Sequence, residues 1–268
     1  MSGRITATFE RLRAEGRAGF VPFIMAGDPS LDVTRELLRA AADGGADLIE
    51  LGVPFSDPMA DGPGLQRSAE RALAAGTTLT DVLGLIAEFR RQSAVPIVVF
   101  GYANPFLRYG AERLAADAAA SGADGVLCVD LPPEEADDLQ VATDAAGLDL
   151  IFLLAPTSDR SRIEQVKARA RGFVYYVSIT GTTGAAAPDP REVATMVQSV
   201  RDRVGLPVGV GFGIAGPAPA AEVAKIADAV VVGSAVMRLV EEHPGPALVP
   251  AAREFLRGVA DAVHAARG

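Results

Sequence analysis

Eight short apolar segments, each followed by an amphipathic stretch, constrain the fold of this chain more than any other feature. Each segment is rich in Val, Ile and Phe and closes with Gly, Pro or Asp, and the stretch that follows is dense in Ala, Leu, Arg and Glu. Strand–helix alternation of this kind gives right-handed crossovers and a parallel sheet. Eight such units predict an α/β fold, a (β/α)8 (TIM) barrel. The expected strands cover residues 20–25, 47–52, 96–101, 125–130, 149–154, 173–178, 207–212 and 229–233.

An open, doubly wound sheet has the same local alternation and is the alternative. The barrel is favoured because the residues that could carry out catalysis or binding fall just after strands, and a barrel gathers all those strand ends on one face. No linker, low-complexity tract or charge run divides the sequence, so residues 1–268 are expected to form one domain. Residues 6–15 are expected to add an N-terminal helix that closes the bottom of the barrel.

Charge and composition exclude several classes of function. The chain has 25 Lys and Arg against 34 Asp and Glu, a net charge of −9, which argues against nucleic acid or a membrane surface as a partner. No stretch reaches about 18 uninterrupted apolar residues, and the N-terminus lacks the features of a signal peptide. With a single cysteine, the chain is expected to work in the cytoplasm.

The basic and thiol side chains are poorly placed for catalysis. His243 and His264 lie in the last helical region, which disfavours a histidine base or a zinc site, and no metal site is expected. Lys167 and Lys225 fall inside predicted helices, which disfavours a Schiff-base mechanism. Cys128 lies in the middle of a strand and is expected to be a small buried apolar residue. Carboxylates are therefore the candidate catalytic groups.

Glu50 and Asp61 are the two carboxylates of interest. Glu50 ends the second predicted strand among apolar neighbours, and burial there would raise its pKa as a general acid requires; a solvent-facing or arginine-paired Glu is the alternative. Asp61 lies in a loop, residues 54–63, whose prolines and glycines fix its shape, although a surface turn explains Asp57 or Asp61 equally well. Asp28 is expected to cap the first helix after a strand.

Glycines follow the last two predicted strands. They lie at residues 209–214, including Gly213, and at Gly233, which precedes Ser234 at the start of a short helix. Barrels bind phosphate at these two loops, because backbone N–H groups reach the anion where no Cβ intervenes and the helix start is positively polarised. Glycines that only relieve crowding at the rim are the alternative. The small-residue loop at 180–187 is expected to be a mobile lid, with an ordinary surface loop as the alternative.

Apolar side chains gather at or near six strand ends. Beside a phosphate site they indicate a flat apolar ligand with a phosphate tail, although most such residues are simply part of a core. They are Phe23, Phe100, Tyr102, Leu127, Leu153, Tyr175 and Phe212.

Several motifs at these strand ends resemble those of the tryptophan synthase α subunit, and the resemblance spans essentially the whole chain. The most specific stretch runs through residues 50–58 (ELGVPFSDP) and 60–63 (ADGP). Residues 20–23 (FVPF), 27–29 (GDP), 102–105 (YANP), 130–132 (DLP), 182–184 (TTG), 211–214 (GFGI) and 233–234 (GS) also match. Two departures occur: Ala185, Ala186 and Ala187 stand where many relatives have a polar or basic residue, and Val129 replaces a smaller alanine.

The resemblance implies cleavage of indole-3-glycerol phosphate to indole and glyceraldehyde 3-phosphate. Glu50 would protonate C3 of the indole, Asp61 would accept the indole N–H, and Tyr175 and Tyr102 would shape the site. Thr183 would close over Asp61. The substrate-binding set is Phe23, Phe100, Tyr102, Leu127, Leu153, Thr183, Gly184, Phe212, Gly213, Gly233 and Ser234.

The resemblance also implies a β-subunit partner in an α2β2 assembly, with pyridoxal phosphate in the partner and no cofactor in this chain. The implied contacts are Pro54, Asp57, Pro58, Asn104, Pro105, Asp130 and Pro132, although these prolines could merely stiffen the rim. A stand-alone lyase that releases indole, a non-catalytic partner of a β subunit, and a phosphate-binding sensor are the alternatives.

Overall fold

The computed structural model describes residues 3–177, 190–211 and 213–267, in which eight parallel strands form a closed barrel. Each strand pairs with its sequence neighbours, and β1 pairs with β8 in a register that sets Gly19 opposite Ala229. This closure confirms the barrel and excludes the open sheet. The strands are β1 (Gly19–Met25), β2 (Ile49–Gly52), β3 (Ile97–Gly101), β4 (Gly125–Cys128), β5 (Asp149–Leu154), β6 (Val174–Val177), β7 (Val208–Gly211) and β8 (Ala229–Val232).

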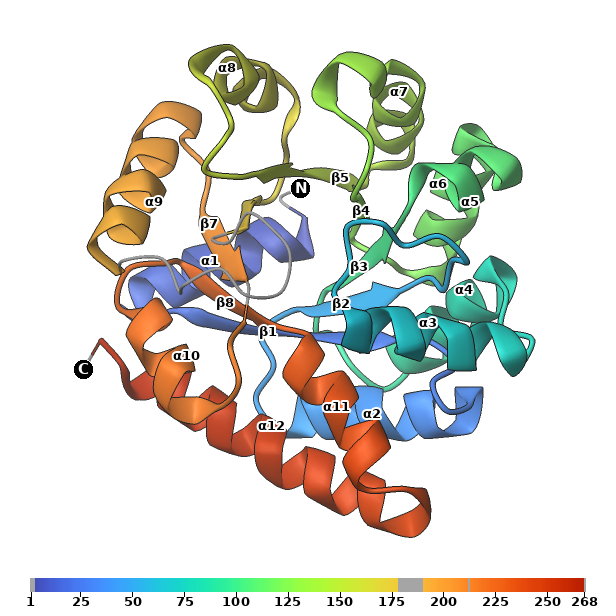
Figure 1. Cartoon of the computed structure of the whole chain (residues 1–268). Coiled ribbons are helices and arrows are strands. Elements are labelled where there is room, and N and C mark those ends of the chain that lie inside the picture. The colour runs from blue at the N-terminus through green and yellow to red at the C-terminus, as the bar shows by residue number, and fades with distance from the viewer. Residues whose placement is uncertain (1–2, 178–189, 212, 268) are drawn as a thin grey trace.

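Helices surround the barrel, as Figure 1 shows. Between β2 and β3 the chain forms two helices, α3 and α4, rather than one. The helices are α1 (Arg4–Ala14), α2 (Leu31–Asp43), α3 (Pro63–Ala74), α4 (Leu79–Arg90), α5 (Ala103–Tyr109), α6 (Ala111–Ser121), α7 (Asp137–Ala146), α8 (Arg160–Arg169), α9 (Pro190–Val204), α10 (Pro217–Ala224), α11 (Ser234–Glu242) and α12 (Leu248–Ala265), with short 3-10 turns at Pro133–Glu135 and Gly245–Ala247.

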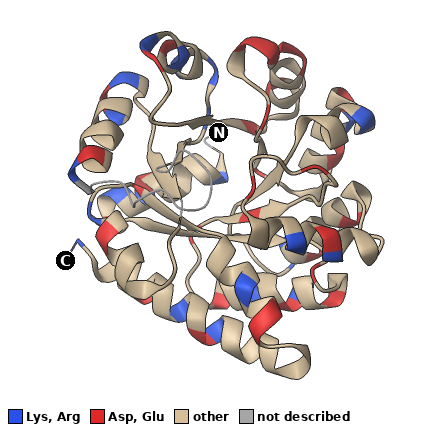
Figure 2. Ribbon diagram, viewed as in Figure 1, with Lys and Arg blue, Asp and Glu red and all other residues tan. Residues whose placement is uncertain are grey.

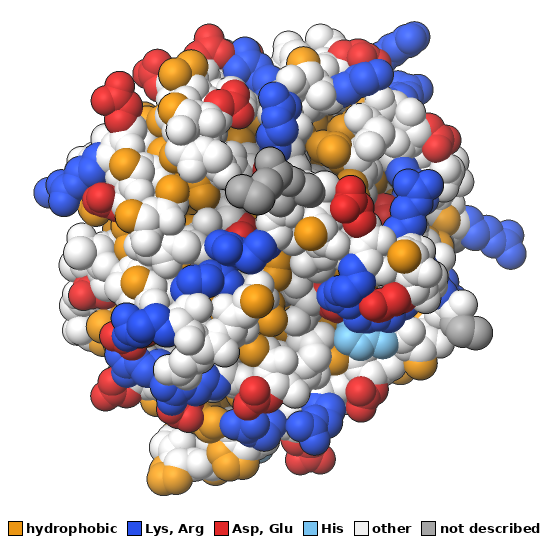
Figure 3. Space-filling view, turned by 180° about the vertical axis from the view of Figure 1, so that it is seen from behind, with side chains coloured by type: hydrophobic (Ala, Val, Ile, Leu, Met, Phe, Trp, Pro, Cys, Tyr) orange, Lys and Arg blue, Asp and Glu red, His pale blue; other side chains and the backbone are white. Residues whose placement is uncertain are grey.

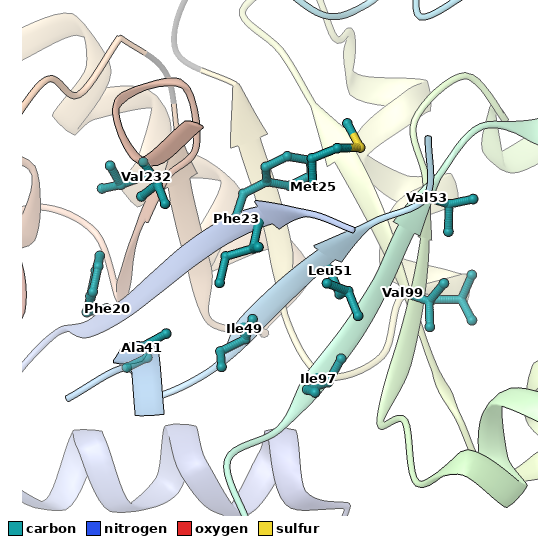
Figure 4. Close-up of a cluster of buried hydrophobic side chains, with 14 of the residues drawn as sticks. Phe20, Phe23, Met25, Ala41, Ile49, Leu51, Val53, Ile97, Val99 and Val232 are labelled. Carbon is teal, nitrogen blue, oxygen red and sulfur yellow. The ribbon is translucent and has the colours of Figure 1, made fainter. Parts of the chain in front are cut away.

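Two apolar clusters hold the barrel and its helices together. The inner cluster fills the barrel and includes Ile5, Phe9 and Leu12 of α1, so the predicted N-terminal helix is confirmed as a plug. The outer cluster lies between strands and helices; Figure 4 shows part of it, where side chains of β1, β2 and β3 gather. Along β3, β4, β5, β6 and β8, successive apolar side chains alternate between these two clusters. The strands therefore hold their inward-facing residues rigidly, including those at the carboxyl-terminal ends of the strands.

The start of α2 corrects one expectation from the sequence. Ser30 is the N-cap, and its Oγ accepts a hydrogen bond from the N–H of Val33 at 3.2 Å. Asp28 is fully buried and pairs instead with Arg71 of α3, to which it offers both carboxylate oxygens, each at 2.7 Å. The prediction that Asp28 caps this helix was wrong, because a buried carboxylate is stabilised far more by a bidentate arginine than by a helix end.

Charged side chains lie mainly on the helices and loops, and the strands are largely free of them (Figure 2). On the face seen from behind, acidic, basic and apolar side chains are interspersed (Figure 3). Among the described residues, no one helix has the length and apolarity to span a membrane, although α3 and α4 pass that test together as a sharply bent pair.

Candidate active site

A cavity of about 1270 Å³ opens at the end of the barrel where the strands finish. Its lining comes from strand ends and from the loops that follow them, which are far apart in sequence. Of the predicted residues, it contains Phe23, Glu50, Asp61, Phe100, Leu153, Tyr175, Gly213, Gly233 and Ser234. The cavity therefore brings together the two carboxylates, the apolar side chains and the glycine-rich loops.

Glu50 lies at the floor of this cavity on β2. Its side chain is 1% exposed, and its Oε1 has no hydrogen-bond partner among the described residues. Burial raises the pKa of Glu50 to about 8, because nothing close by compensates a negative charge there. At neutral pH the group is therefore protonated, which confirms the expected burial and makes proton donation possible.

Asp61 lies on the cavity wall, just before α3. Its main-chain carbonyl accepts a hydrogen bond from Gln66 Nε2 at 2.9 Å, and its N–H donates to the carbonyl of Pro58 at 3.0 Å. Burial raises the pKa of Asp61 to about 6, and the nearby Tyr102 hydroxyl limits that rise. Asp61 is thus an anion at neutral pH in a pocket where Glu50 is neutral. The two carboxyl groups have different charges because Glu50 is more deeply buried.

Aromatic and aliphatic side chains form the apolar part of the cavity. The rings of Phe23 and Phe100 meet edge to face, with centroids 5.0 Å apart. Leu153, Val129 and Val231 complete this part of the lining. Together they form an apolar compartment of the kind that holds a flat ring.

Tyr175 reaches the cavity only because Gly211 has no side chain. A Cβ on Gly211 would stand 2.1 Å from the Tyr175 Oη and 2.7 Å from its Cζ, closer than any real contact. Burial raises the pKa of Tyr175 well above its usual value, and the charges of Glu50 and Asp61 raise it further. The phenol therefore stays protonated and can only donate its hydrogen or pack.

Gly213, Gly233 and Ser234 line the side of the cavity where α11 begins. Gly213 has φ +63°, a conformation that side chains other than glycine rarely adopt, and Gly233 precedes the first turn of α11. The free N–H groups of a helix start attract anions. This side of the cavity is therefore suited to a phosphate.

Some predicted residues lie elsewhere. Leu127 is fully buried inside the barrel and does not line the cavity. Tyr102 is also buried beside the lining. The centroid of its ring lies 5.4 Å from that of Phe55, and its hydroxyl is close to Asp61. Thr183, Gly184 and Phe212 lie outside the described residues, as does the predicted lid at 180–187.

The residues predicted to contact a partner all follow β2, β3 or β4. Asp57, Asn104 and Asp130 are exposed, and Pro105 and Pro132 are half-buried. Pro54 and Pro58 are buried within the chain, so they shape the loop rather than present surface. Met59 is 88% exposed in the same loop and was not predicted; an apolar residue between prolines gave no sequence signal of exposure.

Sequence reasoning also missed Gln66, whose amide holds the Asp61 carbonyl, and the polar rim formed by Glu134 and Arg162, which are paired at 3.0 Å. A glutamine one turn into a helix is too common to stand out in a sequence. The histidines and lysines do not line the cavity, in agreement with the prediction. The Nε2 atom of His264 instead lies 2.7 Å from the Oδ2 atom of Asp47, which precedes β2.

This fold defines the chain as a TIM barrel, and its cavity at the strand ends combines two carboxyl groups with an apolar lining and glycine-rich loops. The comparisons with known proteins are more specific. The family model described as tryptophan synthase alpha chain matches residues 9–261. The tryptophan synthase alpha chain of Geobacter sulfurreducens is 52% identical over 260 residues, covering 97% of this chain and 98% of the relative. That of Geotalea uraniireducens is also 52% identical, covering 98% and 97%.

Solved structures agree. The subunit alpha of tryptophan synthase from Legionella pneumophila str. Paris superimposes with a TM-score of 0.91 at 37% identity, covering 98% of this chain and 99% of that one. A chain of Mycobacterium tuberculosis tryptophan synthase gives 0.90 at 36% identity, covering 98% and 99%. The chain belongs to the tryptophan synthase alpha chain family. It is a carbon–carbon lyase of tryptophan biosynthesis that cleaves indole-3-glycerol phosphate to indole and glyceraldehyde 3-phosphate.

Proposed function

We propose that Glu50 is the general acid of this cleavage and that Asp61 stabilises the charge that forms on the indole. The observation that carries the proposal is that one cavity holds two carboxyl groups in different surroundings: Glu50 is buried with its Oε1 unpaired, and Asp61 lies on the wall. Burial raises the pKa of Glu50 to about 8 and that of Asp61 only to about 6. Carbon–carbon cleavage requires C3 of the indole to be protonated first, because only then can the ring accept the electrons of the breaking bond.

Each step of the reaction then has a group to carry it. Glu50 gives its proton to C3, and the resulting cation is stabilised by Asp61, which accepts the indole N–H. Glu50, now an anion, takes the proton of the hydroxyl next to the ring. The bond between C3 and the hydroxyl-bearing carbon breaks, its electrons return to the ring, and indole and an aldehyde leave. The proton taken from the hydroxyl restores Glu50 to its starting form.

The rest of the cavity supports the placement of the substrate in this proposal. Phe23, Phe100 and Leu153 enclose the indole, and Tyr175 packs or donates beside Glu50. Gly213, after β7, and Gly233 with Ser234, at the start of α11, bind the phosphate. Tyr102, buried beside the cavity lining, favours the ionised form of Asp61. Thr183 and Gly184 on the lid, Phe212, and the deeply placed Leu127 remain predictions from the family resemblance.

We also propose the assembly that the family implies. A β-subunit partner in an α2β2 complex would cover the end of the barrel where the cavity opens, and the pyridoxal phosphate would belong to that partner. The exposed Asp57, Asn104 and Asp130 would form contacts, with Pro105 and Pro132 beside them and the buried Pro54 and Pro58 fixing the loop. Residues 1–268 would act as one domain in the cytoplasm.

Indole release from indole-3-glycerol phosphate tests the chemical roles. We expect Glu50→Gln and Asp61→Asn each to lower the rate by at least about 100-fold, the usual contribution of a positioned acid or base. Glu134→Gln, at the polar rim of the same cavity, is the matched control and should keep most of the rate. Turnover of Glu50→Gln close to that of the unmodified enzyme would rule out Glu50 as the acid.

A further inference from the structure

Two helices that start at the cavity, α3 after β2 and α11 after β8, are joined further along their length. Helix α3 begins two residues after Asp61, and its Gln66 holds the Asp61 carbonyl. Helix α11 begins at Ser234, on the side assigned to phosphate. The junction lies about 10 Å along α11 from its start and about 6 to 12 Å along α3, given a rise of about 1.5 Å per residue.

Glu241 of α11 makes this junction with two arginines of α3. Its carboxylate accepts hydrogen bonds from Arg67 Nε at 2.9 Å, Arg67 Nη2 at 3.0 Å and Arg71 Nη1 at 2.8 Å. These bonds, that from Arg67 most of all, lower the pKa of Glu241 to about 2. The carboxylate is therefore ionised over the whole working range of pH.

Arg71 is itself anchored from the other side. Its Nε and Nη2 each donate to the fully buried carboxylate of Asp28 at 2.7 Å, and Ser68 donates to the same group. Removing Arg71 would leave the buried charge of Asp28 with no cationic partner, which is costly, so the arginine is held in one place. A single exposed ion pair is worth little, but Glu241 bonds to an arginine that cannot swing away.

We infer that Glu241 is a positioning residue that couples the phosphate-binding start of α11 to the Asp61-bearing start of α3. The inference rests on the proposed roles of Asp61 and of the α11 start. When phosphate draws in the start of α11, the shared carboxylate moves α3 with it, and Asp61 is placed against the indole. Removing Glu241 would leave both ends of the substrate site intact but uncoupled.

Hydrogen exchange tests the coupling without relying on activity. Residues 67–74 of α3 do not line the cavity, so a ligand cannot shield them directly. We expect glycerol 3-phosphate to slow amide exchange there by about tenfold in the unmodified chain, and to leave it unchanged in Glu241→Ala. Glu242→Ala is the matched control: it removes an exposed pair with Arg238 within α11 and should keep the slowing.

Kinetics give the second measurement. Glu241→Ala should bind glycerol 3-phosphate within about twofold of the unmodified chain while kcat falls about tenfold. The acidic limb of its pH profile should move to lower pH, because a loosened Asp61 becomes better hydrated. If Glu241→Ala fails to fold, Glu241→Gln keeps the volume and is measured instead.

The outcomes are distinct. Equal slowing of exchange in the Glu241 and Glu242 variants overturns the coupling, as does a kcat that falls only in proportion to thermal stability with an unmoved pH limb. An unmodified chain that shows no slowing also overturns it. Loss of slowing in the Glu241 variant with no indole release from the unmodified chain supports the coupling and overturns the proposed function.

Discussion

At the scale of single residues, Glu50 and Asp61 have pKa values on either side of neutrality, and this sets the expected pH dependence. Indole release should fall below about pH 6, where Asp61 becomes protonated and no longer accepts the indole N–H. It should also fall above about pH 8, where Glu50 loses the proton that it must donate. A profile of kcat/KM against pH measures both limbs, and a rate that keeps rising beyond pH 9 would contradict the assignment of Glu50.

The burial that makes Glu50 an acid also destabilises the folded chain. Its pKa is about 8 when folded against an ordinary 4.5, so the folded state resists ionisation that the unfolded state accepts. The loss of folding free energy caused by this shift is absent below about pH 4.5, grows as the pH rises to about 8, and is constant at higher pH. Glu50→Gln should therefore increase the free energy of unfolding by on the order of 4 kcal/mol at pH 8.

Urea unfolding at pH 8 and at pH 4 measures this gain, which should nearly vanish at the lower pH. Glu134→Gln, on the exposed rim, should show no such difference between the two pH values. A variant at position 50 that is less stable than the unmodified chain at pH 8 would mean that Glu50 has a stabilising partner in solution.

Asp149, at the other end of the barrel, has a similar cost without a catalytic benefit. Its Oδ2 is buried with no hydrogen-bond partner among the described residues, and burial together with the nearby Asp124 raises its pKa to about 6. Asp149→Asn should stabilise the chain above pH 6 by on the order of 1 kcal/mol, after allowance for solvent screening. The gain should disappear below about pH 4, and thermal unfolding across this range measures it.

At the scale of elements, the glycines of β7 leave space for the aromatic side chains of and beside the neighbouring strand β6. Gly211→Ala should push Tyr175 away from Glu50 and lower kcat by about tenfold or more, because small displacements of groups around a reacting centre are costly. Gly209→Ala on the same strand meets Phe173 at 3.3 Å inside the barrel, and should lower stability more than activity. Equal effects of the two variants on kcat would contradict the claim that Gly211 is needed to place Tyr175 beside Glu50.

The strands were predictable from the sequence because each is a short apolar run closed by a turn residue, and all eight expected segments overlap an observed strand. The burial of Glu50 was also predictable, from its apolar neighbours. The pairing of Asp28 was not: a local Asx signal indicates a helix cap, and the arginine that pairs with Asp28 lies 43 residues away. The depth of Leu127, which lies in the barrel interior below the cavity lining, was not predictable, because strand residues at different depths inside a barrel have the same sequence pattern.

At the scale of the whole molecule, the end of the barrel that carries the cavity also carries the exposed residues of the proposed interface. We expect a cognate β subunit to bind there and to stimulate indole release by about tenfold or more, because ordering the loop of Asp61 completes the site. Co-elution and the rate of indole release, measured with and without the β subunit, check this. Asp57→Lys, on the exposed rim, should weaken binding, whereas Glu222→Lys on α10 should not. No complex and no stimulation would favour the stand-alone lyase.

Closure of the barrel between β1 and β8 has a consequence for how the chain is made. β1 leaves the ribosome early, yet the strand that covers its free edge begins only at Ala229. Until then the growing sheet has two open edges, which are prone to pair with other chains. A nascent or prematurely terminated chain that lacks β8 therefore exposes an unpaired, aggregation-prone strand edge, even if its earlier strands and helices have formed. Chaperones would bind such chains, whereas complete chains can close the barrel.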